Sequence, residues 1–161
     1  MSFTSFQFHS HQLESNCRAL VVSERNYIAN AANISSLVYH SLPDVNWVGF
    51  YFIDNSSPNK ELVLGPFHGK PACIRIPIGK GVCGTVASTA HTMIVDDVHL
   101  FEGHIACDSD SNSEVVIPLI KNNTLLGVFD VDSPIKKRFS QEDVLLLEKI
   151  VTLFVESSDF S

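Results

Sequence analysis

Apolar residues in the first quarter of the chain recur every three or four positions, which is the spacing of one face of an α-helix. These positions are Leu13, Cys17, Leu20, Val21, Ile28, Ala31, Ala32, Ile34, Leu37 and Val38. The pattern predicts helix between about residues 12 and 42, where Pro43-Asp44 stops it. Asn33 is expected to cap a break, so we interpret the segment as two helices.

Short runs of β-branched and aromatic residues, separated by turn formers, follow these helices. The predicted strands are Trp47–Ile53, Glu61–Leu64, Cys73–Ile78, Met93–Val95, Val115–Ile120 and Leu125–Val131. Residues 54–59 and Asn122-Asn123 have the composition of hairpin turns, which predicts antiparallel pairing of the strands on either side. A short helix is expected between the third and fourth strands, from Gly79 to Ala90.

A final amphipathic helix is predicted to begin after Ser140, its expected N-cap, and to reach about Val155. Hairpin-joined strands between terminal helices indicate an α+β fold, with a central antiparallel sheet of about six strands and the N- and C-terminal helices packed on one face. We expect a single domain, 1–161, with the sheet, a lid and the last helix at about 46–156. The lid is the polar segment from Asp96 to Asn112, and loops of this length in compact domains are usually either functional lids or disordered.

Charge and composition argue against several classes of function. The formal net charge is −7 and the only basic cluster is Lys136, Lys137 and Arg138, so we expect no nucleic-acid partner. The N-terminal residues have neither the charged nor the apolar region of a secretion signal, and no stretch approaches the roughly 18 apolar residues that a membrane span needs. We therefore expect a cytoplasmic protein, away from membranes, whose four cysteines are thiols and whose disulfides are transient.

The four cysteines occupy different predicted environments. Cys17 lies on the apolar helical face, where a buried thiol acting as a small hydrophobic group is the usual outcome. Cys107 lies in the polar lid near His104 and several acids, so a reactive role is favoured there. Cys83 is in the first turn of the short helix, where the helix N-terminus can stabilise a thiolate. Cys73 starts a strand, and the sequence leaves a core role and a functional role open for both Cys73 and Cys83.

Three carboxylates lie in or directly beside the last two predicted strands. Glu114 begins one strand, and Asp130 and Asp132 are two residues apart near the end of the next, so these two point to the same face. Carboxylates held together push their pKa values apart, and one can remain protonated as a hydrogen-bond donor. The spacing alone favours the alternative that they are strand-end residues facing water.

Metal and nucleotide sites are less well supported by the sequence. His99, His104 and Cys107, with Asp96 or Asp97, are ligand types that suit zinc, but their spacing matches no standard zinc motif. The glycine-rich segment GKGVCG, at residues 79–84, lacks the Gly-Lys-Ser/Thr ending of a phosphate-binding loop. Its glycines are interpreted as tight-turn residues before a helix.

Several short motifs occur together in this chain. They are Gly81-Val82-Cys83-Gly84, Val95-Asp96-Asp97-Val98, Gly103-His104-Ile105-Ala106-Cys107-Asp108, Ser113-Glu114 and Asp130-Val131-Asp132-Ser133. With three cysteines spaced C-x9-C-x23-C, the chain resembles the free methionine-(R)-sulfoxide reductases, a family built on the GAF fold. The resemblance extends from about Trp47 to Asp143. Glu102 departs from it, because it stands where the family's usual motif has proline.

The resemblance implies a role for three of the cysteines. Cys107 falls at the family's catalytic cysteine, Cys73 at its resolving cysteine and Cys83 at a third, supporting one, whereas Cys17 matches no such position. In the expected reaction, Cys107 attacks the sulfoxide, methionine leaves, and the resulting sulfenic acid forms a disulfide with Cys73. A reductant then restores both thiols.

The resemblance also implies a substrate pocket. Trp47 and Tyr51 match aromatic positions beside the methyl group and body of the substrate, and Glu114, Asp130 and Asp132 match pocket carboxylates. A sulfoxide sulfur is a poor electrophile until its oxygen is protonated, so the attack needs a nearby acid, for which Glu114 and Asp132 are the candidates. Asp130 is the candidate partner for the substrate's ammonium group, and Trp47 for its methyl group.

The resemblance also implies a substrate, a reductant and an oligomeric state, and two other functions compete with it. The family implies free methionine-(R)-sulfoxide as substrate, thioredoxin as reductant, a homodimer, and no metal or tightly held cofactor. A competing hypothesis is a non-catalytic GAF module that senses a small molecule or a redox change, because a fold by itself does not determine a function. A zinc-dependent hydrolase built on His99, His104 and Cys107 ranks below both.

Overall fold

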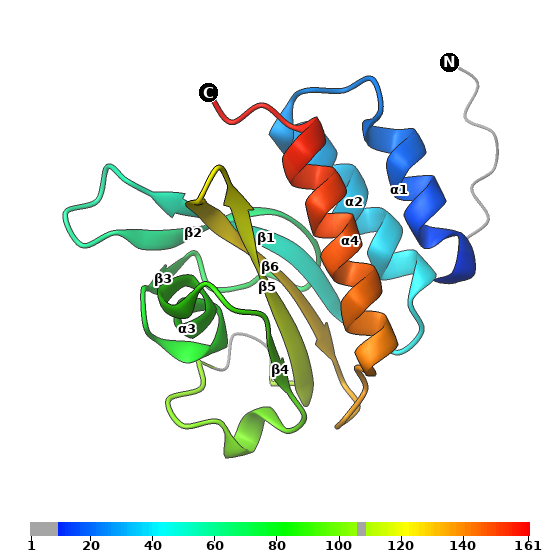
Figure 1. The fold of residues 1–161 in the computed structure, drawn as a ribbon. Helices are drawn as coiled ribbons and strands as arrows, with labels where there is room; N and C mark the ends of the chain where they lie inside the picture. The colour runs from blue at the N-terminus through cyan, green and yellow to red at the C-terminus, as the bar shows by residue number, and fades with distance from the viewer. Residues whose placement is uncertain (1–9, 106–108) are drawn as a thin grey trace.

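The computed structural model describes residues 10–105 and 109–161, and the first two helices of this part lie on one side of a sheet (Figure 1). They are α1 (Leu13–Val21), preceded by the 3-10 turn η1 (Ser10–Gln12), and α2 (Tyr27–Ser41). The break between them lies at residues 22–26, because the Asn26 side chain accepts a hydrogen bond from the Ala29 amide and caps α2. The predicted break at Asn33 is wrong: this residue lies inside α2 on its exposed side, where an asparagine leaves the helical backbone intact.

Six strands form one antiparallel sheet, as predicted, and their order in the sheet is β3-β2-β1-β6-β5-β4. They are β1 (Trp47–Asp54), β2 (Glu61–Gly69), β3 (Arg75–Pro77), β4 (Met93–Val95), β5 (Ser113–Lys121) and β6 (Thr124–Ser133). β2 continues beyond the predicted end at Leu64, because a register shift accommodates the extra residue and its second half pairs with β1. The predicted strand start at Cys73 is wrong, since β3 begins at Arg75.

One face of the sheet is covered by α2 and α4 (Gln141–Ser157), and α1 packs against these two helices on the side away from the sheet (Figure 1). The core between these helices and the sheet includes Leu13, Ile34, Val38, Val48, Phe50, Ile117, Phe129, Val131, Leu147, Ile150 and Phe154. α4 begins with a capping box in which the Ser140 hydroxyl accepts from the Asp143 amide and the Asp143 carboxylate accepts from the Ser140 amide. The predicted N-cap and the predicted packing of the terminal helices on one face are therefore confirmed.

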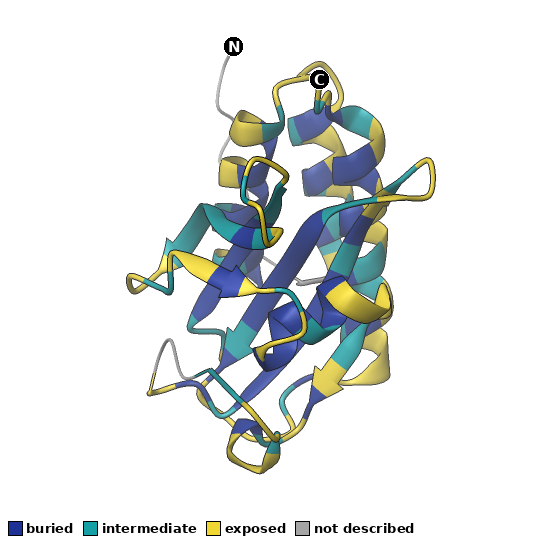
Figure 2. Cartoon of the chain, turned by 90° about the vertical axis from the view of Figure 1, so that its left-hand side faces the viewer, coloured by how far each residue is buried: buried dark blue, intermediate teal, exposed yellow. Residues whose placement is uncertain are grey.

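A second, smaller apolar cluster lies on the opposite face, under α3 (Gly81–Thr89). It includes Trp47, Tyr51, Leu62, Ile76, Val82, Val86, Val116 and Val128. Side chains alternate along a strand, so β1 contributes Trp47 and Tyr51 to this cluster and Val48 and Phe50 to the core under the terminal helices. Figure 2 shows that burial is concentrated along the central strands, while the hairpin tips are exposed.

The turn before α3 is built from glycines, as predicted. Gly79 and Gly81 have φ angles of 83° and 61°, which side chains other than glycine rarely adopt. A Cβ atom on Gly84 would lie 2.4 Å from the carbonyl oxygen of Pro77, so only glycine lets α3 approach β3 this closely.

The predicted lid, residues 96–112, contains a short 3-10 turn, η2 (Val98–Leu100). The Val98 amide donates a hydrogen bond to the Asn112 carbonyl, which joins the two ends of this segment, and the Asn112 amide donates to the Ser133 carbonyl of β6. Cys107 lies outside the described residues. Within residues 10–105 and 109–161, no helix is long and apolar enough to cross a membrane.

Candidate active site

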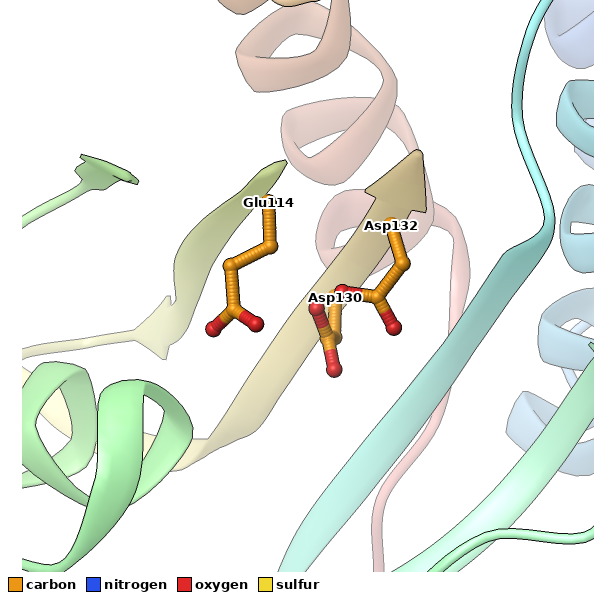
Figure 3. Close-up of side chains that lie close together, drawn as sticks. All are labelled: Glu114, Asp130 and Asp132. Atoms are coloured by element: carbon orange, nitrogen blue, oxygen red, sulfur yellow. The ribbon is translucent and has the colours of Figure 1, made fainter. Parts of the chain in front are cut away.

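Three carboxylate side chains, those of Glu114, Asp130 and Asp132, come together in a pocket on the α3 side of the sheet (Figure 3). Glu114 on β5 is the register partner of Asp132 on β6, and Asp130 lies two residues before Asp132 on the same face. One oxygen atom from each carboxylate lies within 4.8 Å of the others. The expected shared face of Asp130 and Asp132 is confirmed, and the pairing of β5 with β6 brings Glu114 beside them.

Burial dominates the electrostatics of these carboxylates. Glu114 is 6% exposed and Asp130 is 7% exposed, so the alternative in which they face water is wrong for both. Burial raises the pKa of Asp130 to about 7, against the lowering effect of a hydrogen bond from Cys83. Burial and the charge of Asp130 raise the pKa of Glu114 well above its ordinary value, although a hydrogen bond with Asp132 opposes the shift. The cluster therefore retains protons near neutral pH, and a protonated carboxyl there can act as a donor.

Cys83 is buried against this cluster, and its Sγ donates a hydrogen bond to Oδ2 of Asp130 at 3.3 Å. Burial raises the pKa of the Cys83 thiol well above its ordinary value, and the charges of Asp130 and Glu114 raise it further. The expectation that the N-terminus of α3 would favour a Cys83 thiolate is therefore wrong, because desolvation and nearby negative charge outweigh the helix dipole. Cys83 serves the pocket as a neutral hydrogen-bond donor.

An aromatic wall, formed by Trp47 and Tyr51 of β1, borders the carboxylates. Both residues are 2% exposed, and their rings stack with centroids 5.9 Å apart, while Phe67 stacks on the other side of Trp47 at 5.4 Å. Trp47 Nε1 donates a hydrogen bond to the Lys70 carbonyl, and the Tyr51 hydroxyl donates one to the Cys73 carbonyl. These contacts fix both rings in place, so they form a rigid apolar surface in the pocket.

The start of α3 and the neighbouring loops complete the pocket. The other described lining residues are Pro71, Ala72, Ile76, Lys80, Gly81, Val82, Cys83, His104, Ile105 and Ser111. Lys80 is the only lysine or arginine among the lining residues that the structure describes. As the N-cap residue of α3, Lys80 makes no side-chain capping bond, so the first amides of the helix lack a side-chain acceptor. Such a helix start attracts anions.

The cysteines differ in burial and in whether the sulfur is a free thiol or part of a disulfide. Cys17 is completely buried in the core under the terminal helices, and burial raises the pKa of its thiol to about 12, which confirms its expected structural role. Cys17 and Cys83 are free thiols. Cys73, on the segment between β2 and β3, is disulfide-bonded. The predicted catalytic residue, Cys107, falls outside the described residues.

Glu114, Asp130 and Asp132 are also the one group of three described residues with the geometry to hold a metal ion. An all-carboxylate set suits hard cations such as Mg²⁺, Mn²⁺ or Ca²⁺ better than zinc. His99 and His104, the histidines of the zinc hypothesis, are not part of this carboxylate group. His99 Nε2 lies 3.0 Å from the Asn112 side-chain oxygen, and His104 lines the pocket.

Some residues in and around the pocket could not be predicted from the sequence. Ser111 is 5% exposed, and its Oγ accepts a hydrogen bond from the Asn46 side chain at 3.2 Å. Nδ1 of His104 is buried with no hydrogen-bond partner among the described residues, and burial lowers the pKa of this histidine. No local pattern marks Asn46 or Ser111, whereas Lys80 was detectable from its position beside the Gly-Val-Cys-Gly motif.

The chain is similar in sequence and in structure to several known proteins. A model of the GAF domain family matches residues 17–156. The free methionine-R-sulfoxide reductase (fRMsr) of Escherichia coli is 47% identical over 139 residues, which are 86% of this chain and 82% of that protein. The structure of fRMsr of Staphylococcus aureus in complex with substrate is similar with a TM-score of 0.85 and 44% identity, covering 96% of this chain and 99% of that chain. The structure of a proposed GAF sensor protein from Burkholderia vietnamiensis has a TM-score of 0.86 and 56% identity, covering 92% of each chain.

Proposed function

The chain belongs to the free methionine-R-sulfoxide reductases of the GAF domain family, and we propose that it reduces free methionine-(R)-sulfoxide by thiol chemistry. The observation that carries this function is the group of three carboxylates, two of them buried and Asp132 half-buried, beside an aromatic wall. Such a pocket offers a free amino acid a partner for its ammonium group and an apolar surface for its methyl group. The chain acts as a single GAF domain.

Asp130 holds the ammonium group of the substrate. Its Oδ1 atom is buried and has no hydrogen-bond partner among the described residues, a costly arrangement that a bound ammonium would relieve. The raised pKa of Asp130 supports this assignment, because a positive charge at this position would stabilise the ionised carboxylate. A peptide-bound methionine sulfoxide has no free ammonium group and would lose this interaction.

The substrate's α-carboxylate is held at the other side of the pocket, at the start of α3. Gly81, Val82 and Cys83 line the pocket there, and Lys80 supplies a positive charge. The pocket thus offers acids to the ammonium group and a cation with helix amides to the carboxylate, which matches the zwitterion of a free amino acid.

The sulfoxide is reduced in two steps. The sulfoxide oxygen takes a proton from Glu114 or Asp132, whose cluster retains protons near neutral pH, and Cys107 attacks the sulfur, which leaves free methionine and a sulfenic acid on Cys107. Cys73 then displaces water from the sulfenic acid and forms a disulfide with Cys107. Support for Cys73 as the resolving thiol comes from its disulfide-bonded state, while Cys17 and Cys83 are free. Cys83 supports the reaction through its contact with Asp130.

Thioredoxin restores the two thiols, and the enzyme works as a homodimer in the cytoplasm. An enzyme whose cysteines must return to the thiol state after each turnover suits a reducing compartment. Reduction of the disulfide by a dithiol protein completes the cycle, because each turnover consumes two thiols of the enzyme.

An assay of the purified protein with thioredoxin, thioredoxin reductase and NADPH tests this function. We expect NADPH consumption with the R epimer of free methionine sulfoxide and little with the S epimer or with a methionine sulfoxide inside a peptide. Equal rates on the peptide would contradict the assignment of Asp130 to the free ammonium group. Tight binding of the free R epimer without methionine release, even with a small dithiol as reductant, would favour the non-catalytic sensor.

The assignment of the cysteines is tested by a single turnover without reductant, followed by peptide mapping. We expect loss of two thiols and a bond between Cys73 and Cys107, with Cys17 still reduced. Cys107→Ser should release no methionine, and Cys73→Ser should release one equivalent and then stall. A bond between Cys83 and Cys107 would mean that Cys83 is the resolving thiol instead.

A further inference from the structure

The segment that carries Cys73 is attached to β1 by two side chains of the aromatic wall. Residues 70–74 connect β2 to β3 without regular secondary structure. The Tyr51 hydroxyl donates to the Cys73 carbonyl at 3.0 Å, and Trp47 Nε1 donates to the Lys70 carbonyl at 3.1 Å. The Ile74 carbonyl accepts a hydrogen bond from the Leu64 amide at 2.9 Å, which attaches the end of the segment to β2.

We propose that the Tyr51 hydroxyl is a positioning group for the resolving cysteine, holding Cys73 in place for the step in which the disulfide forms. This inference rests on the proposed function, because it concerns the second step of the same reaction. The hydroxyl acts on Cys73 through the backbone carbonyl of that residue and touches no reacting atom in the step.

Rigidity of the donor supports this role. Tyr51 belongs to a central strand of the sheet, is 2% exposed, and has its ring held by stacking on Trp47. Burial and the neighbouring acids keep the pKa of Tyr51 above its ordinary value, so the hydroxyl remains a donor throughout the working pH range. The Cys73 carbonyl is therefore held by a donor that neither moves nor ionises, at the one residue of the segment whose side chain reacts.

The chemistry of the second step explains why position matters. The Cys73 sulfur forms a bond to the sulfenic sulfur, the S–O bond breaks, and the oxygen leaves as water with the proton of the Cys73 thiol. No outside oxidant is needed, because the sulfoxide has already supplied the oxidising equivalent. The rate of such an internal reaction depends on how often the attacking thiol is in place. A neutral hydrogen bond in a protein contributes a factor of about five to ten, which sets the expected size of the effect.

Tyr51→Phe tests the proposal, because it removes one hydroxyl and keeps the ring in the aromatic wall. In a single turnover of the reduced protein, we expect the ratio of the rate of disulfide formation to the rate of methionine release to fall by about five- to tenfold. The sulfenic acid should accumulate and be trapped by dimedone. Tyr27→Phe is the matched control, because Tyr27 packs against Phe52 and Phe160 on the opposite face of the sheet and should change neither rate.

The thiol–disulfide equilibrium of the protein with glutathione provides a second measurement, which requires no substrate. The effective concentration of the two thiols toward each other should fall by about five- to tenfold in Tyr51→Phe and stay unchanged in Tyr27→Phe. The proposal is overturned if the Tyr51→Phe variant forms its disulfide within twofold of the wild-type rate, or if methionine release slows as much as disulfide formation. A wild-type protein that releases no methionine would instead contradict the proposed function, and the glutathione equilibrium would still decide the role of Tyr51.

Discussion

Replacing Asp130 by asparagine should remove a large pH dependence from the stability of the protein. Asparagine has nearly the same shape, and its side-chain oxygen can accept the hydrogen bond that Cys83 donates to Asp130. The substitution therefore removes the ionisable proton and leaves the packing of the pocket in place. Because Asp130 is also assigned to the substrate's ammonium group, the same variant should lose turnover without unfolding.

The size and sign of the effect follow from the pKa of Asp130, which burial raises from 3.8 to about 7. Between these values the unfolded chain has lost this proton and the folded protein keeps it, so the folded state binds more protons. Wild-type stability must then fall as the pH rises through this window, and the contribution is fully present only below about pH 4. A shift of about 3 pKa units corresponds to about 4 kcal/mol, at roughly 1.4 kcal/mol per unit.

Urea unfolding at pH 5, 6, 7 and 8, with thiols kept reduced, measures this effect. Trp47 is the only tryptophan of the chain and lies in the pocket, so its fluorescence reports unfolding around Asp130. The free energy of unfolding of Asp130→Asn, relative to wild type, should rise by about 3 kcal/mol from pH 5 to pH 8. Asp54→Asn is the control, because hydrogen bonds from Ser56 and Arg75 lower the pKa of this carboxyl to about 2 and it stays ionised throughout.

A difference between Asp130→Asn and wild type that stays constant within about 0.5 kcal/mol across this range would refute the reasoning. It would mean that the folded protein does not keep a proton on Asp130. Glu114→Gln, measured in the same way, then shows whether the coupled partner holds the proton instead, because burial raises the pKa of Glu114 in the same direction.

Three further predictions concern the backbone, the last helix and the substrate. Gly127→Ala should lower the free energy of unfolding by more than about 2 kcal/mol, measured by urea unfolding, because its Cβ would lie 2.0 Å from the Tyr51 carbonyl oxygen. Ser140→Ala removes the N-cap of α4 and should cost about 1 kcal/mol in the same measurement, with an unchanged stability counting against the capping box. Methionine sulfoxide carboxamide, which lacks the α-carboxylate, should show a KM raised by about tenfold in the NADPH assay, and an unchanged KM would place the carboxylate away from Lys80 and α3.

Local pattern in the sequence predicted the elements and some of the site. The alternation of side chains along a strand was enough to place Asp130 and Asp132 on one face. The capping residues Ser140 and Asp143 marked the start of α4 because their hydrogen bonds involve neighbouring residues only. The resemblance of short motifs to those of a known family identified Cys73, Cys83 and Cys107 as the candidate functional cysteines. Asparagine fits both a helix end and an exposed helix position, so the sequence alone favours a cap at Asn33. Only the hydrogen bond from the Ala29 amide to the Asn26 side chain shows where α2 begins.

Tertiary structure decided the properties on which the chemistry depends. The register of β5 against β6 brings Glu114 opposite Asp132, although 17 residues separate them in the chain. Burial between α3 and the sheet then raises the pKa of Asp130 on β6 and of Cys83 on α3, which reverses the expectation of a Cys83 thiolate. The sequence determines which groups can ionise. Whether they do so depends on how much water surrounds them and which charges lie within a few ångströms, and both are settled only when distant segments pack together.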